Sequence, residues 1–162
     1  MRYIDFLRRE HRKEYKIRKL RRRPPEGLER LVNRFYDEVR SGSPILVEGK
    51  HDIIALESSF GFGNYVLINR RRVPLRAVIQ ESIELFGRRQ IIMTDIDKKG
   101  NALAEKIKGI VNEMGGIPIL KYRNILRLFN VQFVESLLSR SSEIKAMLRI
   151  LDVELSPRPE FE

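Results

Sequence analysis

The sequence predicts an α/β domain built on a four-stranded parallel sheet that helices cover on both faces. Between residues 45 and 120, four short apolar runs alternate with segments whose apolar residues recur at helical spacing. This alternation is typical of βαβ units, in which a crossover helix joins two parallel strands. Right-handed crossovers then leave only a few strand orders for such a sheet.

The chain begins with a strongly basic segment that ends at Pro24-Pro25. Residues 1–23 hold eleven Lys and Arg side chains against three acidic ones, and so carry most of the formal net charge of +10. The loose helical spacing of their apolar residues predicts a basic helical arm, which the two prolines end because they lack an amide donor. A second helix is expected from 27 to about 39, before the turn signal at 41–44.

The remaining elements are predicted from the spacing of apolar residues and from the glycines and prolines between them. The four predicted strands are compact apolar runs at 45–47, 65–68, 91–94 and 117–120. Glycines end the helical patterns between them, which lie at about 53–56, 75–86 and 103–114. Pro118 predicts that the fourth strand is an edge strand, because proline cannot donate to a central ladder. Two further helical stretches are expected at about 125–138 and 143–151.

These elements divide the chain into three predicted parts. We expect a basic helical N-terminal extension at 1–43, the α/β domain at 44–122 and a helical C-terminal extension at 123–162. No apolar run reaches the roughly 18 residues of a membrane helix, and the N-terminus lacks the apolar core of a signal peptide. We therefore expect a cytoplasmic protein with no membrane partner.

Composition restricts the chemistry that this chain can carry. Cysteine is absent, and the only histidines are His11 and His51. Disulfides, thiolate zinc sites and cysteine nucleophiles are therefore excluded, and a metal would have to be held by carboxylates. Carboxylate oxygens favour a hard cation such as Mg²⁺ or Mn²⁺. The sequence also lacks a P-loop, a nicotinamide fingerprint and a serine triad.

Acidic residues follow two of the predicted strands at the point where each strand ends. Glu48 follows the first strand, and Asp95 and Asp97 follow the third. Ligands of open α/β sheets bind beyond the carboxyl ends of the strands, and a 2-1-3-4 order would make these two strands neighbours. Three carboxylates would then converge, which is costly unless a divalent cation neutralises them. Gly49 and Gly100 would leave room for a phosphate to approach closely.

Two segments around these acids resemble the motifs of the Toprim family. ILVEGKHD, at 45–52, resembles an apolar strand followed by Glu-Gly, and IIMTDIDKKGNALAEKI, at 91–107, resembles an apolar strand followed by Asp-x-Asp. Toprim domains occur in bacterial-type primases, topoisomerases, OLD-family nucleases and the maturase of 5S ribosomal RNA. The resemblance covers residues 45–120 and is strongest to the small, nearly stand-alone Toprim proteins of archaea. It implies a compact, Rossmann-like Toprim fold for the α/β domain.

The resemblance also implies roles for the acidic residues. Glu48 would act as a general acid or base or share a metal, while Asp95 and Asp97 would hold Mg²⁺ where it bridges phosphate oxygens. Asp52 would cap its helix or support the cluster from behind, together with the glycines of the two motifs. The Lys98-Lys99 pair stands where the small RNA-processing members vary, and it receives no catalytic role.

Basic residues are candidates for contacts with nucleic acid. Several contacts to phosphates would make the affinity strongly dependent on salt. Simple solvation of a charged loop or arm is the alternative explanation. The candidates are Lys50, Arg70, Arg71 and Arg72 near the acids, and Arg21, Arg22 and Arg23 in the arm.

Three functions compete at this stage. The leading hypothesis is a Mg²⁺-dependent nuclease that cleaves RNA, or DNA, and the alternative is a non-catalytic RNA-, DNA- or ribonucleoprotein-binding module with a vestigial metal site. A primase- or topoisomerase-like activity ranks third, because 162 residues leave no room for a tyrosine-bearing domain and cysteine is absent. The oligomeric state stays open, although the helical additions could form a dimer interface.

Overall fold

The computed structural model describes residues 27–150. The predicted basic arm, with Arg21, Arg22 and Arg23, lies outside the described residues, and so does the C-terminal segment 151–162.

A four-stranded parallel sheet in the order β2-β1-β3-β4 forms the centre of the molecule. Its strands are β1 (Pro44–Val47), β2 (Asn64–Leu67), β3 (Arg89–Ile92) and β4 (Ile117–Ile119). Ile45 lies opposite Tyr65 of β2 and Ile91 of β3, so β1 and β3 are neighbours in register. The predicted α/β class is confirmed, and β4 is an edge strand, as Pro118 predicted.

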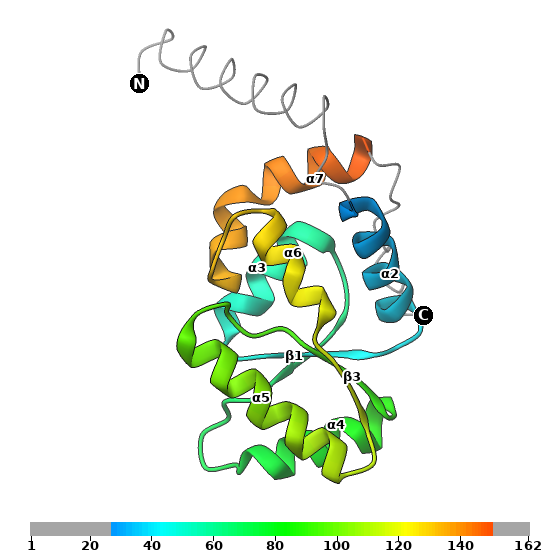
Figure 1. The fold of residues 1–162 in the computed structure, drawn as a ribbon, viewed down its shortest axis with the longest axis vertical. Helices are drawn as coiled ribbons and strands as arrows, with labels where there is room; N and C mark the ends of the chain where they lie inside the picture. Colours follow the sequence, from blue (N-terminus) through cyan, green and yellow to red (C-terminus); the bar gives the residue numbers. More distant parts are fainter. Residues whose placement is uncertain (1–26, 151–162) are drawn as a thin grey trace, which may run out of the picture.

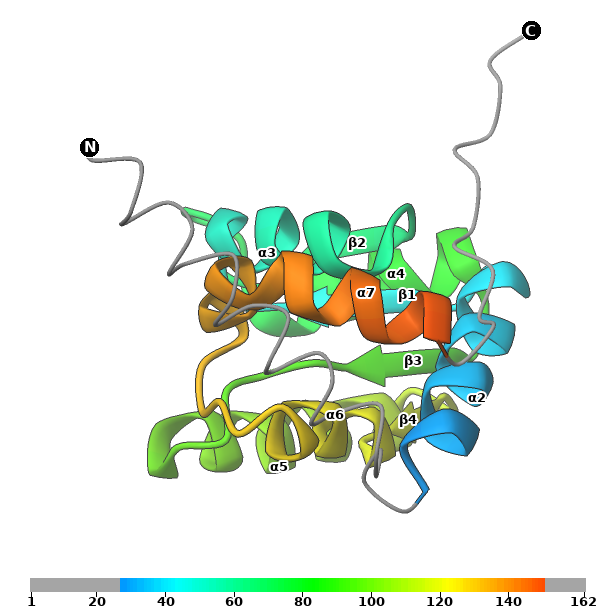
Figure 2. The same ribbon diagram turned by 90° about the horizontal axis from the view of Figure 1, so that it is seen from above.

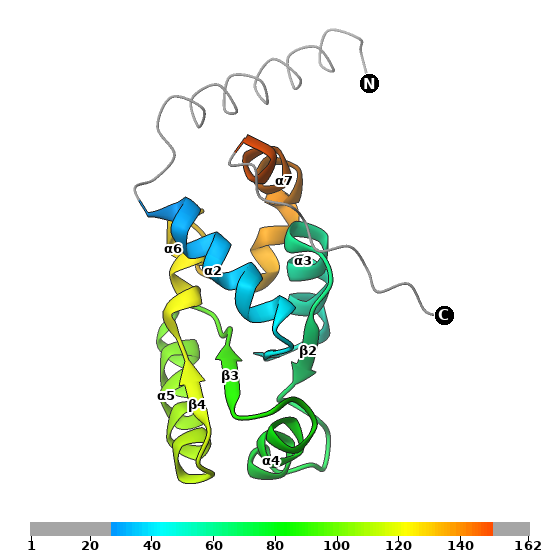
Figure 3. The same ribbon diagram turned by 90° about the vertical axis from the view of Figure 1, so that its right-hand side faces the viewer.

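Helices cover both faces of the sheet (Figures 1 and 3). One face carries α4 (Leu75–Phe86) and α5 (Lys98–Glu113). The other face carries α2 (Leu28–Arg40), α3 (Lys50–Phe60), α6 (Asn124–Leu128), α7 (Ser141–Ile150) and the short 3-10 helices η1 (Lys121–Arg123) and η2 (Val134–Arg140). Figure 2 shows α7 running alongside α3, which it contacts. None of the helices in residues 27–150 is both long and apolar enough to span a membrane.

The strands are apolar throughout because each side chain faces one of two packed cores. In β1, Ile45 and Val47 join the core under α2 and α3, whereas Leu46 joins the core under α4 and α5. All three are at most 1% exposed. Successive side chains of a strand point to opposite faces, so a sheet covered on both sides needs an unbroken apolar run.

The expectation of one helix at 125–138 is wrong. Helix α6 ends at Leu128, and η2 begins only at Val134. Between them Asn130 has a φ of 56°, in the left-handed region that asparagine tolerates better than most side chains. Its amide donates to the Arg127 carbonyl (3.0 Å), which closes the helix end. The chain then turns back towards the carboxyl ends of the strands.

Replacing Asn130 should reveal how much this helix end contributes to stability. We expect Asn130→Val to lower the free energy of unfolding by roughly 1–2 kcal/mol, because a side chain branched at Cβ is strained at positive φ. Asn130→Gly should unfold at nearly the wild-type urea concentration, because glycine adopts this conformation without a clash. Equal urea midpoints for the valine variant and the wild type would contradict this explanation of the break.

Candidate active site

A cavity of about 490 Å³ opens at the carboxyl end of the sheet. Its lining includes Glu48, which follows β1, and Asp95 and Asp97, which follow β3. The structure thus brings the three predicted carboxylates to one cavity, because β1 and β3 are adjacent parallel strands. Arg70 and Lys99 line the same cavity, so it holds both signs of charge.

Glu48 is the carboxyl group whose proton affinity is most altered in this cavity. Burial raises the pKa of Glu48 to about 7, and a hydrogen bond with Asp95 and the negative charges of Asp95, Asp52 and Asp97 act in the same direction. Each of these effects disfavours the ionised form. A carboxyl group with a pKa near neutrality can both accept and release a proton at physiological pH, which is the property that acid–base catalysis requires.

Asp97 caps α5, and Gly100 allows it to do so. The Gly100 amide donates to Asp97 Oδ1 (2.6 Å), and Thr94 Oγ1 donates to the Gly100 carbonyl (2.9 Å). A Cβ atom at Gly100 would lie 2.1 Å from the Asp95 carbonyl oxygen. The space beside Gly100 is therefore filled by the protein's own backbone, contrary to the expectation from the sequence that it would be left open for a phosphate.

Asp95 is held by a segment that lies far along the chain. Its Oδ1 accepts the Val134 amide (2.7 Å), and the Ile96 amide donates to the Gln132 carbonyl (2.7 Å). The break after α6 brings the Gln132 carbonyl and the Val134 amide to the loop after β3. This contact could not be predicted from the sequence, because the local spacing of residues 125–138 resembles one continuous helix.

Arg123 fastens the loop that carries the two aspartates. Its Nη2 donates to the Asp95 carbonyl (2.6 Å) and to Asn101 Oδ1 (2.7 Å), and its Nε donates to the Thr94 carbonyl (3.1 Å). Burial lowers the pKa of Arg123, followed by the positive charge of Arg127. Arg123 was not among the residues predicted from the sequence, although it follows β4 and therefore lies at the same end of the sheet as the acids.

Asp52 supports the loop after β1 from a buried position. It is 7% exposed, and its Oδ2 accepts the Gly49 amide (3.2 Å). Burial raises the pKa of Asp52, while the hydrogen bond from Gly49 opposes the shift. A Cβ atom on Gly49 would meet nothing within 4 Å, so open space does lie beside this residue. The neighbouring Lys50 begins α3 and is exposed.

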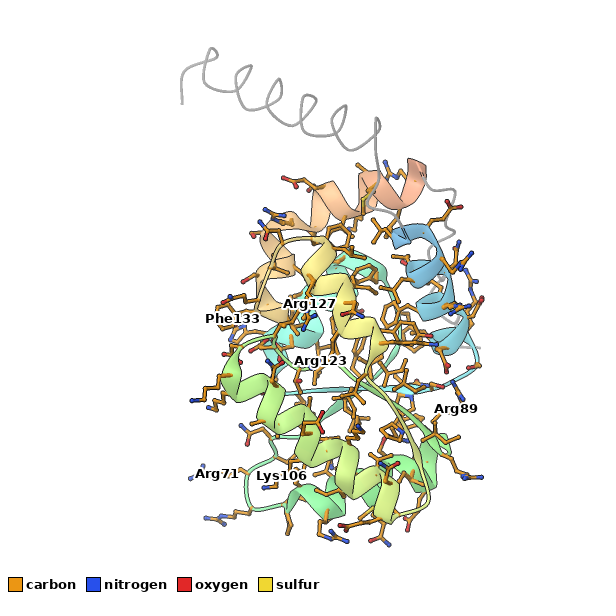
Figure 4. All side chains as sticks on the ribbon, viewed as in Figure 1. Arg71, Arg89, Lys106, Arg123, Arg127 and Phe133 are labelled. Atoms are coloured by element: carbon orange, nitrogen blue, oxygen red, sulfur yellow. The ribbon has the colours of Figure 1, made fainter. Side chains whose placement is uncertain are left out.

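The arginines after β2 have different surroundings. Arg70 lines the cavity and forms an ion pair with Glu81 (3.1 Å). Arg71 and Arg72 are exposed, and Arg72 has a left-handed φ of 64°. Figure 4 shows Arg71 projecting outward from this loop. Lys99, for which the sequence predicted no role, lies in the cavity wall instead.

The carboxylates of the cavity are suitable ligands for a hard divalent cation, but they are not arranged around a single metal position. Within residues 27–150, no group of three or more His, Asp or Glu side chains is arranged to hold a metal ion. Mg²⁺ usually keeps several waters and binds through one or two carboxylates, so it does not require such a cage. Asp95 and Asp97 each use Oδ1 for a backbone amide, and each has a second carboxylate oxygen. Burial is the main cause of the raised pKa of Glu48, and the negative charges of the neighbouring aspartates, which a cation would neutralise, add to it.

Glycine at position 100 should be essential for the geometry of the loop. We expect Gly100→Ala to lower the free energy of unfolding by about 1–3 kcal/mol, because the added methyl group must displace the Asp95 carbonyl. Gly109→Ala, in the same helix with nothing within 4 Å, is the matched control and should raise it by about 0.5–1 kcal/mol. Urea denaturation of both variants would test this, and a loss at position 109 equal to that at position 100 would argue against the steric cause.

The raised pKa of Glu48 predicts a pH-dependent stability. Between its ordinary value of 4.5 and about 7, the folded protein binds more protons than the unfolded chain, so the free energy of unfolding falls as the pH rises and levels off above 7. At pH 8, Glu48→Gln should be more stable than the wild type by on the order of 1 kcal/mol after solvent screening, or about 2–4 °C in melting temperature. At pH 4.5 the two should melt together. Identical melting curves at pH 8 would contradict the crowding of charge around Glu48.

Known proteins are similar to this chain in sequence. Residues 43–120 match the Toprim domain. The UPF0292 protein of Methanosarcina barkeri is 32% identical over 123 residues, which is 74% of this chain and 84% of that protein. The UPF0292 protein of Thermoplasma volcanium is 31% identical over 94 residues, or 58% of this chain and 77% of that protein.

One solved structure is also similar to this chain. A putative protein from Aquifex aeolicus is 27% identical, with a TM-score of 0.57 over 69% of this chain and 99% of that one. The Toprim domain indicates a metal-dependent function in nucleic-acid processing. The chain therefore belongs to the archaeal UPF0292 proteins and carries the Toprim domain that its two motifs predicted.

Proposed function

We propose that this protein is a Mg²⁺-dependent nuclease that hydrolyses phosphodiester bonds, with RNA as the favoured substrate. The observation that carries the proposal is the shared cavity of Glu48, Asp95 and Asp97, in which Glu48 has a pKa of about 7. Perturbed carboxyl groups that converge in a concave site are typical of catalytic centres. RNA is favoured because the compact build resembles that of the 5S ribosomal RNA maturase.

The two signs of charge in the cavity suit a cation and a phosphate together. Asp95 and Asp97 would hold the cation, and Mg²⁺ bound there would polarise a phosphoryl oxygen and offset the charge that develops on it. Lys99 and Arg70 line the same cavity and can bind the other phosphate oxygens. Hydrolysis then requires a water molecule that attacks phosphorus while the P–O bond to the leaving oxygen breaks.

Glu48 is the group best suited to move the proton in this reaction. In its ionised form, its carboxylate can take the proton of the attacking water, and in its neutral form it can supply the proton that the leaving oxygen needs. A pKa near 7 makes both forms available at neutral pH. Binding of a cation would lower that pKa and favour the role of base.

Loss of the Glu48 carboxyl should abolish cleavage without abolishing the fold. We expect Glu48→Gln to reduce the rate at which labelled structured RNA is cleaved in Mg²⁺ by about 10²–10⁴-fold, the usual contribution of a general acid or base. The double variant Asp95→Asn/Asp97→Asn, and wild type in EDTA, should yield no product. Glu29→Gln on the exposed face of α2 is the matched control and should cleave at the wild-type rate.

The same experiment separates the nuclease from a binding module. Wild-type cleavage in Mg²⁺ or Mn²⁺, tested on structured RNA and on single-stranded DNA, would identify the substrate class. Cleavage by Glu48→Gln at the wild-type rate would refute the role of that residue. Tight binding that is indifferent to metal, with no product from any substrate, would replace the nuclease with a non-catalytic nucleic-acid-binding function.

A further inference from the structure

An exposed aromatic side chain lies in the segment that is hydrogen-bonded to Asp95. Phe133 is 41% exposed, whereas the next residue, Val134, is fully buried. The backbone at Phe133 is extended, with φ −105° and ψ 135°, so that these two side chains point in opposite directions. The amide of Val134 is the group that binds Asp95. Phe133 is thus one residue from a direct contact with the acid loop.

The backbone on both sides of Phe133 is fixed. The carbonyl of Gln132 accepts the amide of Ile96, and the amide of Val134 donates to Asp95, so the backbone on each side of Phe133 is hydrogen-bonded to the loop after β3. Among residues 27–150, no other aromatic ring stacks on Phe133. The ring of Phe133 therefore has no aromatic partner within the described structure.

Arg127 supplies a positive charge in the same region. Its side chain is exposed and forms no hydrogen bond or ion pair with the described residues. Its charge acts on Arg123, whose own guanidinium is occupied by the Thr94 and Asp95 carbonyls. In the view of Figure 4, Arg123, Arg127 and Phe133 are seen in the same part of the molecule, and Arg123 and the Val134 amide both bind Asp95. Arg127 is therefore the arginine of this group that can bind an external anion.

An exposed ring and an exposed guanidinium, both linked to the loop after β3, match the chemistry of an unpaired nucleotide. Every base has a π face that stacks on an aromatic side chain, and arginine binds the phosphates of the same strand. In a duplex the base faces are covered by their neighbours, so a ring on the protein surface cannot reach them. We propose that Phe133 and Arg127 form a stacking platform that delivers an unpaired strand to the acid cavity, so that the substrate class is single-stranded nucleic acid.

The platform specifies the substrate class of the proposed nuclease. It rests on that proposed function only in that the bound strand would be cleaved in the neighbouring cavity. Binding to the platform itself requires no cation and no cleavage. The two proposals can therefore fail independently, provided that binding is measured in EDTA and cleavage is measured in Mg²⁺.

Binding of a labelled twelve-nucleotide strand to the full chain, followed by fluorescence anisotropy in EDTA, tests the platform. We expect Phe133→Leu to weaken the binding of single-stranded RNA by about tenfold, while Phe133→Tyr, which keeps the ring, retains wild-type affinity. Arg127→Gln should lower the slope of log affinity against log salt concentration by about 0.7. A DNA strand of the same sequence distinguishes a preference for ribose, and a hairpin duplex should show no dependence on residue 133.

Two control substitutions lie away from the cavity, one at the amino ends of the strands and one in the later turns of α5. Phe62 is 36% exposed and precedes β2, at the amino ends of the strands, so Phe62→Leu removes an exposed ring away from the cavity. Lys108→Gln removes one exposed positive charge from the later turns of α5. Neither should change single-strand binding by more than about twofold. Thermal unfolding of every variant verifies that the fold is intact.

The outcomes separate cleanly. Weaker single-strand binding in Phe133→Leu but not in Phe62→Leu, with rescue by tyrosine, supports the platform even if no cleavage is ever detected. Equal losses in both phenylalanine variants, or equal single-strand affinity of Phe133→Leu and the wild type, overturn it, and Mg²⁺-dependent cleavage in that case would leave the nuclease standing. A loss in Phe133→Leu that tyrosine does not restore also overturns it, because stacking requires only the ring.

Discussion

Carboxyl groups crowded at one edge of a sheet repel one another, and the structure around them depends on how that repulsion is contained. Three of the four acids accept a backbone amide: Asp97 from Gly100, Asp95 from Val134, and Asp52 from Gly49. Glu48 accepts no such amide among the described residues, and its pKa is the one raised to about 7. Burial and the repulsion of the neighbouring acids therefore both raise the pKa of Glu48, the group best placed to exchange a proton.

The restraints on this cluster come from outside the region that carries the Toprim motifs. Residues 43–120 match the domain and contain all four acids. Val134 and Arg123, which hold Asp95 and its loop, lie beyond that match. The same C-terminal segment buries Leu137 and Leu148 in the core shared with β1 and β3. The segment that follows the domain thus belongs to the geometry of the site and to the core beneath it.

The parts of this architecture that repeat locally could be predicted from the sequence. Alternating apolar runs predicted the sheet, and the bounds of α4 follow from its spacing and from Gly87. The convergence of Glu48 with Asp95 could be predicted because it depends only on the strand order, and right-handed crossovers allow few strand orders. Contacts between distant segments left no such pattern: the Val134 amide that binds Asp95 lies 39 residues further along the chain. It reaches Asp95 because the left-handed Asn130 interrupts an apparently helical spacing.

The kind of group that restrains the acids matters as much as its position. A lysine or arginine paired to each carboxylate would hold it firmly but would cancel the charge that attracts a cation. Backbone amides restrain Asp95 and Asp97 through dipoles and add no net charge. Arg123 also bonds to backbone carbonyls of the loop and to Asn101, not to a carboxylate, but unlike the amides it adds a positive charge that acts on Asp95 and Glu48. Such a site keeps its negative charge while its geometry stays fixed, which is the condition under which a divalent cation would bind most strongly.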